Sequence, residues 1–87
     1  MALIITVHER ESSIEVILEG RLAGPWVNEL SRAWRETAPR LGGKKLTMNL
    51  RNLTYFIEDG KQLLRMIDAQ TSADILTSDP SMKHLTL

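Results

Sequence analysis

The amino-acid sequence predicts an α/β fold: a mixed, mainly parallel four-stranded sheet with an N-terminal β-hairpin and helices packed on it. Three observations lead to this fold class. Apolar and polar residues alternate with a period of two near the start of the chain, as in a half-buried strand. Apolar positions then recur with the helical period of about 3.6 residues. Strand-like and helix-like segments continue to alternate in the order β-β-α-β-α-β-α, and such strand–helix–strand units need parallel crossovers.

The first two strands are predicted over Leu3–His8 and Ser13–Glu19. The first segment is rich in β-branched residues. The second alternates, and its apolar side consists of Ile14, Val16 and Leu18. Because only the short polar turn Glu9–Ser12 separates the two segments, we expect an antiparallel hairpin.

A helix is predicted after the hairpin, with Pro25 in its first turn and the helical spacing beginning at Trp26. Proline suits the first turn of a helix, where no backbone donor is required. The apolar positions with helical spacing are Val27, Leu30, Trp34 and Leu41. Pro39 and the pair Gly42–Gly43 favour the end of the helix at this point.

A short strand over Lys45–Leu50 and a second helix over Gly60–Gln70 are predicted next. Asp59 is expected to be the N-cap of this helix, with Gln62 at the position of a capping-box partner. These two elements complete one strand–helix unit.

The predicted order ends with a short strand over Ala73–Leu76 and a short final helix over Pro80–Leu85. Ser78 or Asp79 is expected to cap this helix.

Length and composition limit the functions open to the chain. With 87 residues we expect a single domain, residues 1–87. Eleven basic and eleven acidic side chains cancel, whereas nucleic-acid-binding proteins usually carry a basic excess. No cysteine is present, which excludes disulfides and thiolate metal sites. The longest apolar run, Met1–Ile5, is too short for membrane insertion and follows no basic segment, so we expect a cytoplasmic protein.

Few side chains are placed as in a catalytic or cofactor site. Gly20 and Gly24 are followed by Pro25, not by the lysine and hydroxyl residue of a phosphate-binding loop. His8 and His84 lie at opposite ends of the chain, and a histidine beside acidic residues at a strand end is more typical of a solvated edge than of a metal site. We therefore expect no enzymatic activity, no metal and no cofactor.

Two tryptophans lie on the first predicted helix. Packing against the sheet is favoured for Trp34. Trp26 is roughly 80° away around the helix, so its place in the core or in an exposed aromatic patch for a partner stays open.

The stretch Asn49–Gly60 carries the clearest indication of a functional site. The strand is expected to end at Leu50, and the polar loop after it consists of Arg51, Asn52, Thr54 and Tyr55. Partners of open α/β sheets bind in the crevice beyond the carboxyl ends of the strands. Glu58 and Asp59 place negative charge at the start of the next helix, which stabilises that helix and discourages a phosphate ligand.

Three stretches of the sequence resemble the STAS family, the domain of bacterial anti-sigma factor antagonists. Ile17–Gly24 is similar to the strand and glycine-x-leucine-x-glycine turn of that family, Leu46–Thr54 to its aliphatic–aspartate–leucine strand and loop, and Gly60–Leu64 to its glycine-initiated helix. The resemblance implies a non-enzymatic protein-binding module for signal transduction and transcription regulation. Family members dock a strand–loop–helix surface onto a partner, often a kinase-like anti-sigma factor, and phosphorylation of a serine or threonine switches this docking.

The resemblance also implies a contact surface, which comprises Arg51, Asn52, Thr54, Glu58, Asp59 and the turn Leu22–Pro25, with Leu22 and Gly24 in it. Aligning Gly60 places the phosphorylated position of the family at Asp59, and places Asn49 where the family often has aspartate. An aspartate accepts no phosphate from a serine/threonine kinase and carries a fixed negative charge. We therefore expect the phosphoserine switch to be absent.

Two alternatives stay open beside this hypothesis. STAS-like domains also occur as accessory subunits of phospholipid-transport ABC ATPases, a role that needs no phosphoserine. A small nucleotide-binding domain is the third hypothesis, although Glu58 and Asp59 are the only clustered acid pair and no phosphate cradle is present. Family domains usually add a strand and a helix after the point that corresponds to Leu87, so we expect a less covered last sheet edge, which favours a homodimer.

Overall fold

The computed structural model describes residues 2–78. The elements are β1 (Leu3–Glu9), β2 (Ser13–Leu22), α1 (Pro25–Leu41), β3 (Lys45–Phe56), α2 (Glu58–Thr71) and β4 (Asp74–Leu76). The predicted order of elements is confirmed as far as β4. The predicted final helix Pro80–Leu85 and its cap Asp79 lie outside the described residues.

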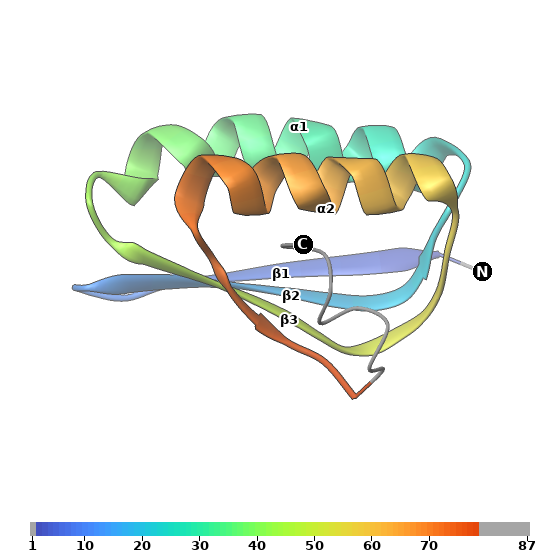
Figure 1. Cartoon of the computed structure of the whole chain (residues 1–87), viewed down its shortest axis with the longest axis horizontal. Coiled ribbons are helices and arrows are strands. Elements are labelled where there is room, and N and C mark those ends of the chain that lie inside the picture. Colours follow the sequence, from blue (N-terminus) through green and yellow to red (C-terminus); the bar gives the residue numbers. More distant parts are fainter. Residues whose placement is uncertain (1, 79–87) are drawn as a thin grey trace.

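The four strands form one sheet in the order β1-β2-β3-β4. β1 and β2 are antiparallel, whereas β3 is parallel to both β2 and β4. The mixed, mainly parallel sheet predicted from the sequence is thus confirmed. α1 and α2 lie next to each other over the same face of this sheet (Figure 1), so the other face carries no helix of residues 2–78.

β3 is longer than the sequence predicted. The strand was expected to end at Leu50 with a polar loop after it, but it continues to Phe56. Between the residue pairs Ile17–Asn49 and Glu19–Asn52, β2 advances by two residues and β3 by three, so β3 contains one extra residue. A second extra residue of β3 lies between Leu53 and Tyr55. Each extra residue is a β-bulge, which disrupts the period of two. Consecutive polar residues at the first bulge therefore have the pattern of a loop in the sequence while they belong to a strand.

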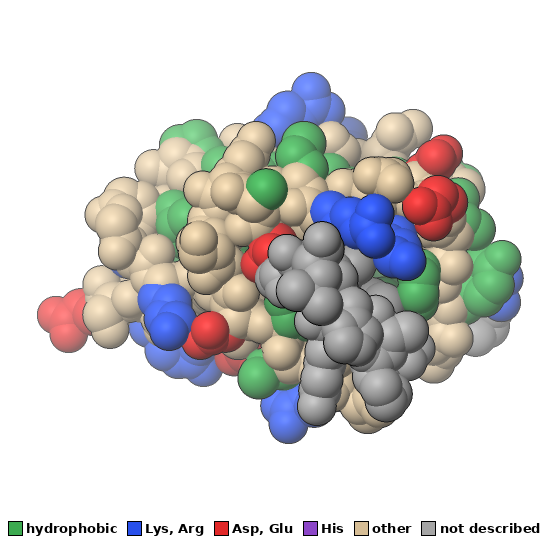
Figure 2. All heavy atoms as spheres, in the orientation of Figure 1, with side chains coloured by type: hydrophobic (Ala, Val, Ile, Leu, Met, Phe, Trp, Pro, Cys, Tyr) green, Lys and Arg blue, Asp and Glu red, His purple; other side chains and the backbone are tan. Residues whose placement is uncertain are grey.

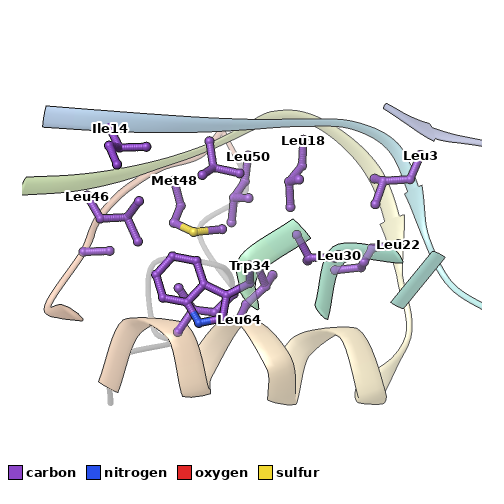
Figure 3. Close-up of a cluster of buried hydrophobic side chains, with 13 residues drawn as sticks. Leu3, Ile14, Leu18, Leu22, Leu30, Trp34, Leu46, Met48, Leu50 and Leu64 are labelled. Carbon is purple, nitrogen blue, oxygen red and sulfur yellow. The ribbon is translucent and has the colours of Figure 1, made fainter. Parts of the chain in front are cut away.

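The core lies between the sheet and the two helices (Figure 3). β2 and β3 contribute fully buried aliphatic side chains, among them Ile14, Leu18, Leu22, Leu46, Met48 and Leu50. Burying one such side chain is worth about 1.5–3 kcal/mol, so this layer supplies most of the driving force for folding. Trp34 is 6% exposed, which confirms its predicted place in the core, and Trp26 is partly buried and packs against the same cluster.

No helix among residues 2–78 is long and apolar enough to cross a membrane. In the same residues no three His, Asp or Glu side chains come together as ligands for a metal ion, and His8 is exposed.

Candidate functional site

Two connections meet at one end of the sheet. The turn after β2 leads into α1 and the connection after β3 leads into α2, both at the right-hand end of Figure 1. The backbone N–H of Ile57 donates to the carbonyl oxygen of Leu22 with an N···O distance of 3.1 Å, which ties the two connections together. Gly60, in the first turn of α2, is buried against Leu22. The start of α2 is therefore held in place relative to the β2–α1 turn.

The start of α2 carries two exposed carboxylates, Glu58 and Asp59, which we call the acidic rim. Gln62 Nε2 donates to Glu58 Oε1 at 3.1 Å. Neither carboxylate forms an ion pair with another residue of the described range 2–78. Exposed acidic side chains are visible at this end of the molecule, at the right of Figure 2. The free N–H groups of the first helical turn stabilise negative charge at this place, so the acidic rim is compatible with a stable helix.

The predicted N-cap of α2 is wrong by two residues. Ile57, in an extended conformation, occupies the N-cap position, and no side chain caps the helix. Asp59 lies in the first turn instead, and Gln62 bonds to Glu58 rather than to the backbone of a cap residue. Because the Asp59 carboxylate accepts no hydrogen bond from the described residues, it is accessible to donors of another molecule.

The β2–α1 turn and the second bulge contribute three of the predicted contact residues. Gly24 is exposed with a φ of 57° and offers only backbone groups. Thr54 is exposed, and its hydroxyl donates to the carbonyl oxygen of Gly20 at 2.9 Å. Leu22 is 0% exposed, so its side chain reaches no partner in this conformation. The expectation for Leu22 is corrected: β2 extends to this residue and turns its side chain into the core.

Arg51 and Asn52 lie in β3, away from the acidic rim. Seven positions of nearly extended chain, at about 3.3 Å each, separate Arg51 from Glu58, a span of up to about 23 Å. The backbone N–H and Nε of Arg51 both donate to Asn49 Oδ1, at 3.2 and 3.3 Å. The predicted surface is therefore divided: the turn and the acidic rim lie together, whereas Arg51 and Asn52 belong to the strand.

Asn49 is a residue whose role the sequence did not indicate. It is 8% exposed, and its Nδ2 donates to Glu15 Oε2 at 3.2 Å while its Oδ1 accepts from Arg51 at the first bulge. The hydrogen bond from Asn49 lowers the pKa of Glu15 from its ordinary value. Asn49 thus joins two strands and satisfies the backbone donor that the bulge releases.

Arg21 and Tyr55 form a second pair that sequence reasoning missed. They are neighbours across β2 and β3, and the Arg21 guanidinium lies 4.3 Å from the centroid of the Tyr55 ring. Tyr55 is 45% exposed, so the stacked pair is accessible on the surface. The pairing depends on the second bulge, which has no clear signal in the sequence.

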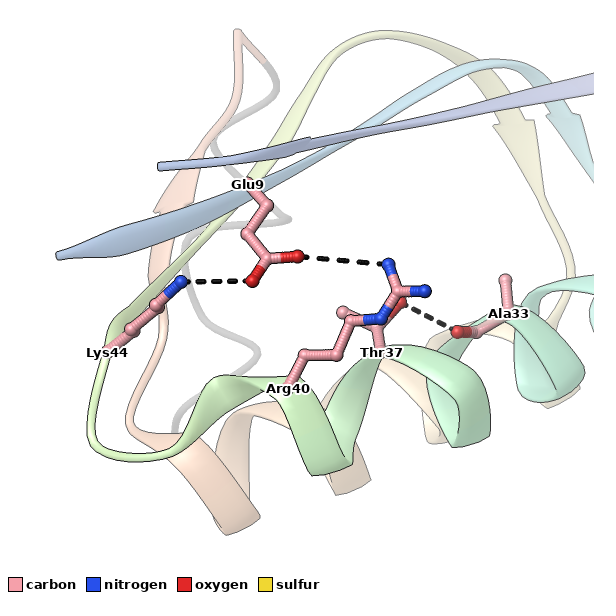
Figure 4. Close-up of polar contacts among 5 residues, drawn as sticks. All are labelled: Glu9, Ala33, Thr37, Arg40 and Lys44. Carbon is pink, nitrogen blue, oxygen red and sulfur yellow. Dashed lines mark hydrogen bonds and ion pairs between the residues drawn. The ribbon is translucent and has the colours of Figure 1, made fainter. Parts of the chain in front are cut away.

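The opposite end of the sheet is held by an ion cluster around Glu9 (Figure 4). The Glu9 carboxylate lies 3.0 Å from Lys44 Nζ and 3.8 Å from Arg40 Nη1. The hydrogen bond and charge of Lys44, together with the charge of Arg40, hold the pKa of Glu9 below its ordinary value of 4.5. This cluster joins the end of β1 to the end of α1, which is a structural role.

Comparison with known proteins identifies the fold. No family model matches the sequence, and a search of curated proteins finds no match. Among solved structures, the unphosphorylated form of the anti-sigma factor antagonist SpoIIAA superposes with a TM-score of 0.65 at 19% identity, over 95% of this chain and 81% of that chain. The chain has the fold of SpoIIAA. The fold expected from the resemblance to STAS domains is thereby confirmed.

Two structures of Mglu contain a similar arrangement. One matches with a TM-score of 0.64 at 18% identity, over 86% of this chain and 19% of that chain. The other, Mglu in its native form in the presence of 4.3 M NaCl, matches with a TM-score of 0.52 at 14% identity, over 92% of this chain and 27% of that chain. The chain thus spans only about a fifth to a quarter of the Mglu chains, and the likeness concerns the fold alone.

Proposed function

We propose that this chain is a non-enzymatic protein-binding module that presents its acidic rim to a basic surface of a protein partner, as part of a cytoplasmic signalling circuit. The observation that carries the proposal is the acidic rim itself, where Glu58 and Asp59 are exposed and form no ion pair within residues 2–78. The shared fold with SpoIIAA, an anti-sigma factor antagonist, supports the same class of function.

The acidic rim is suited to selecting a partner. Two adjacent carboxylates on the surface attract a basic patch over several ångströms, and this attraction raises the association rate more than it raises the final affinity. Each exposed ion pair is worth only about 0–1 kcal/mol, so neighbouring groups must add to the binding energy. Gly24 and Thr54 are exposed residues of the expected contact surface that would add such contacts.

The proposed module works without a phosphorylation switch. Asp59 occupies the position that the resemblance to STAS domains assigns to the phosphorylated residue, and its carboxylate carries one fixed charge where a phosphate carries about −1.5 to −2. A kinase-like anti-sigma factor is the proposed partner. A phospholipid-transport ABC ATPase is the alternative, because that role needs no phosphorylated side chain.

Affinity capture from the native host tests the proposal. The parent chain is expected to retain a kinase-like protein. Glu58→Lys/Asp59→Lys is expected to lose it while still folding, although the reversed charges at the start of α2 lower its melting temperature by several degrees. Glu11→Lys/Glu36→Lys is the matched control, since it makes the same charge change at two exposed positions outside the acidic rim. Equal capture by all three proteins contradicts the proposal, and capture of an ABC ATPase in place of a kinase-like protein selects the alternative.

A calorimetric titration of the chain with ATP and with GTP tests the nucleotide-binding hypothesis. Heat of binding in either titration would contradict a module that binds protein only.

A further inference from the structure

β1 forms one edge of the sheet. Within residues 2–78 it pairs with β2 only. Two hydrogen bonds define the phase of this pairing: Arg21 N donates to Ala2 O at 3.5 Å, and Arg10 N donates to Ser13 O at 2.8 Å. In an antiparallel ladder, every second residue bonds to the neighbouring strand. The even-numbered residues of β1 therefore bond to β2, and the odd-numbered ones direct their N–H and C=O groups away from the sheet. The outward-directed groups before the charged end of the strand belong to Leu3, Ile5 and Val7.

This edge lacks the features that commonly keep edge strands apart, which are charges, prolines, bulges and short length. The segment Ala2–Val7 contains no charged residue and no proline, and its register with β2 is continuous. Ile4 is 58% and Val7 37% exposed. β4, at the other edge, has two of these features. It is only three residues long, and it begins with the charged residue Asp74, whose Oδ2 lies 3.1 Å from Lys45 Nζ. Among residues 2–78, nothing pairs with the outer edge of β1, so the sheet is open to strand addition there.

We propose that β1 pairs with β1 of a second copy of this chain, antiparallel, about a two-fold axis at Ile5. In this register Ile5 faces Ile5 of the second copy, and Leu3 faces Val7. The three outward-directed pairs exchange about six backbone hydrogen bonds, two for each pair. On the face of the sheet that α1 and α2 cover, all three pairs are apolar. On the opposite face, Ile4 lies opposite Thr6 of the second copy. An axis at Thr6 would instead place Glu9 opposite Leu3 and lose part of the apolar match.

A second copy is the occupant that the strand itself specifies. In a two-fold contact, a strand pairs antiparallel with the same strand of the second copy, so the segment must be compatible with its own sequence read backwards. Ala2–Val7 meets this requirement because all of its residues are apolar or neutral. The net charge of the chain is zero, so two copies do not repel each other. The result is one continuous sheet across two molecules, with the start of α2 outside the contact strand.

Sedimentation equilibrium between about 10 μM and about 1 mM measures the association. The parent chain is expected to dimerise in this range. Val7→Lys, which places a charge on the edge at a half-exposed position, is expected to weaken the dimer at least about tenfold. Met66→Lys is the matched control, because Met66 is 42% exposed on α2, and it is expected to leave the dimer unchanged.

Amide hydrogen exchange followed by NMR provides a second measurement, on the parent alone. In a dimer the amides of Leu3, Ile5 and Val7 become protected as concentration rises, whereas those of Ile4 and Thr6 are protected at every concentration. A parent that stays monomeric with fast exchange at Ile5 overturns the proposal, and so does a dimer that a folded Val7→Lys leaves intact. If Val7→Lys does not fold, the amide hydrogen exchange of Ile5 in the parent decides whether the proposal holds. Protection there that appears only when a different protein is added assigns the edge to that protein and also overturns the proposal.

Discussion

Gly60 and Leu22 lie closer together than any side chain at position 60 would allow. A Cβ placed on Gly60 would be 2.7 Å from Leu22 Cγ and 3.2 Å from the Leu22 carbonyl oxygen. α2 begins directly against the end of β2 because this position carries no side chain. The same approach places the acidic rim beside the β2–α1 turn, so a glycine in the core contact determines where the exposed charges lie.

Gly60→Ala is expected to destabilise the fold by about 1–3 kcal/mol, because the added methyl group overpacks the contact with Leu22. Helix propensity alone would stabilise the variant by about 1 kcal/mol, so the sign of the change distinguishes the two effects. Urea unfolding measures it. In the double variant Gly60→Ala/Leu22→Ala, the loss should be smaller than the sum of the single losses, since the smaller residue makes room. A Gly60→Ala variant more stable than the parent would show that the contact is not tight.

Gly20→Ala is expected to cost more stability than Gly43→Ala. Both glycines have positive φ, 101° and 88°, so each substitution bears a backbone penalty of about 1–2 kcal/mol. A Cβ on Gly20 would also overlap the carbonyl oxygen of Ala2, whereas one on Gly43 meets nothing within 4 Å. The difference in free energy of unfolding between the two variants therefore isolates the overlap, for which we expect about 1–3 kcal/mol. Equal losses would contradict the close approach of Ala2.

Asn49→Asp is expected to destabilise the protein by about 1–3 kcal/mol at neutral pH, because it replaces the donor to Glu15 with a second carboxylate. The loss should diminish in acid, where one of the two carboxyl groups takes up a proton. Chemical denaturation at pH 7 and in mild acid measures both effects. Glu15→Gln in the Asn49→Asp background is the control: it restores a donor–acceptor pair and should recover most of the stability. No recovery would contradict the hydrogen bond between Asn49 and Glu15 as the source of the loss, since aspartate keeps the oxygen that accepts from Arg51.

Glu9 is expected to make part of the stability dependent on pH. Its pKa is lowered in the folded chain, so its contribution is fully present above the ordinary value of 4.5 and is lost as pH falls through the folded value. Glu9→Gln removes this contribution at neutral pH and should flatten the decline of the free energy of unfolding below about pH 4.5. Glu11→Gln, at an exposed position in the β1–β2 turn with no ion pair in the described chain, is the control and should retain the steep decline. Identical acid profiles for the three proteins would contradict the role of the Glu9 cluster.

The fold was predictable where one periodicity holds through a whole element. In Ser13–Glu19 every second residue is apolar and inward-facing, and the hairpin, the helices and the parallel order followed from such segments. β3 was predicted only to Leu50, because its inward residues change from a spacing of two to a spacing of three at the bulges. A bulge depends on the partner strand, and a single sequence carries no record of that partner's register.

The candidate site was predictable in part for the same reason. The charge of the acidic rim follows from residue types and from its place at a helix start, and both are local. The separation of Arg51 from the acidic rim depends on how far β3 continues. That extension is set by tertiary pairing, beyond the reach of local patterns. Leu22 continues the inward-facing series of Ile14, Val16 and Leu18, but the predicted strand ended at Glu19, so this residue was assigned to the turn.

The parallel partner of β2 has a consequence for the chain during its synthesis. β1 and β2 can form a hairpin within about 10 μs of leaving the ribosome, but β3 emerges only after the 17 residues of α1. At a synthesis rate of about 5–20 residues per second, the apolar face of the hairpin remains exposed to water for seconds. The nascent chain is then most vulnerable to aggregation, and a chaperone that recognises short aliphatic segments would meet its substrate at Ile14–Leu18 in that interval.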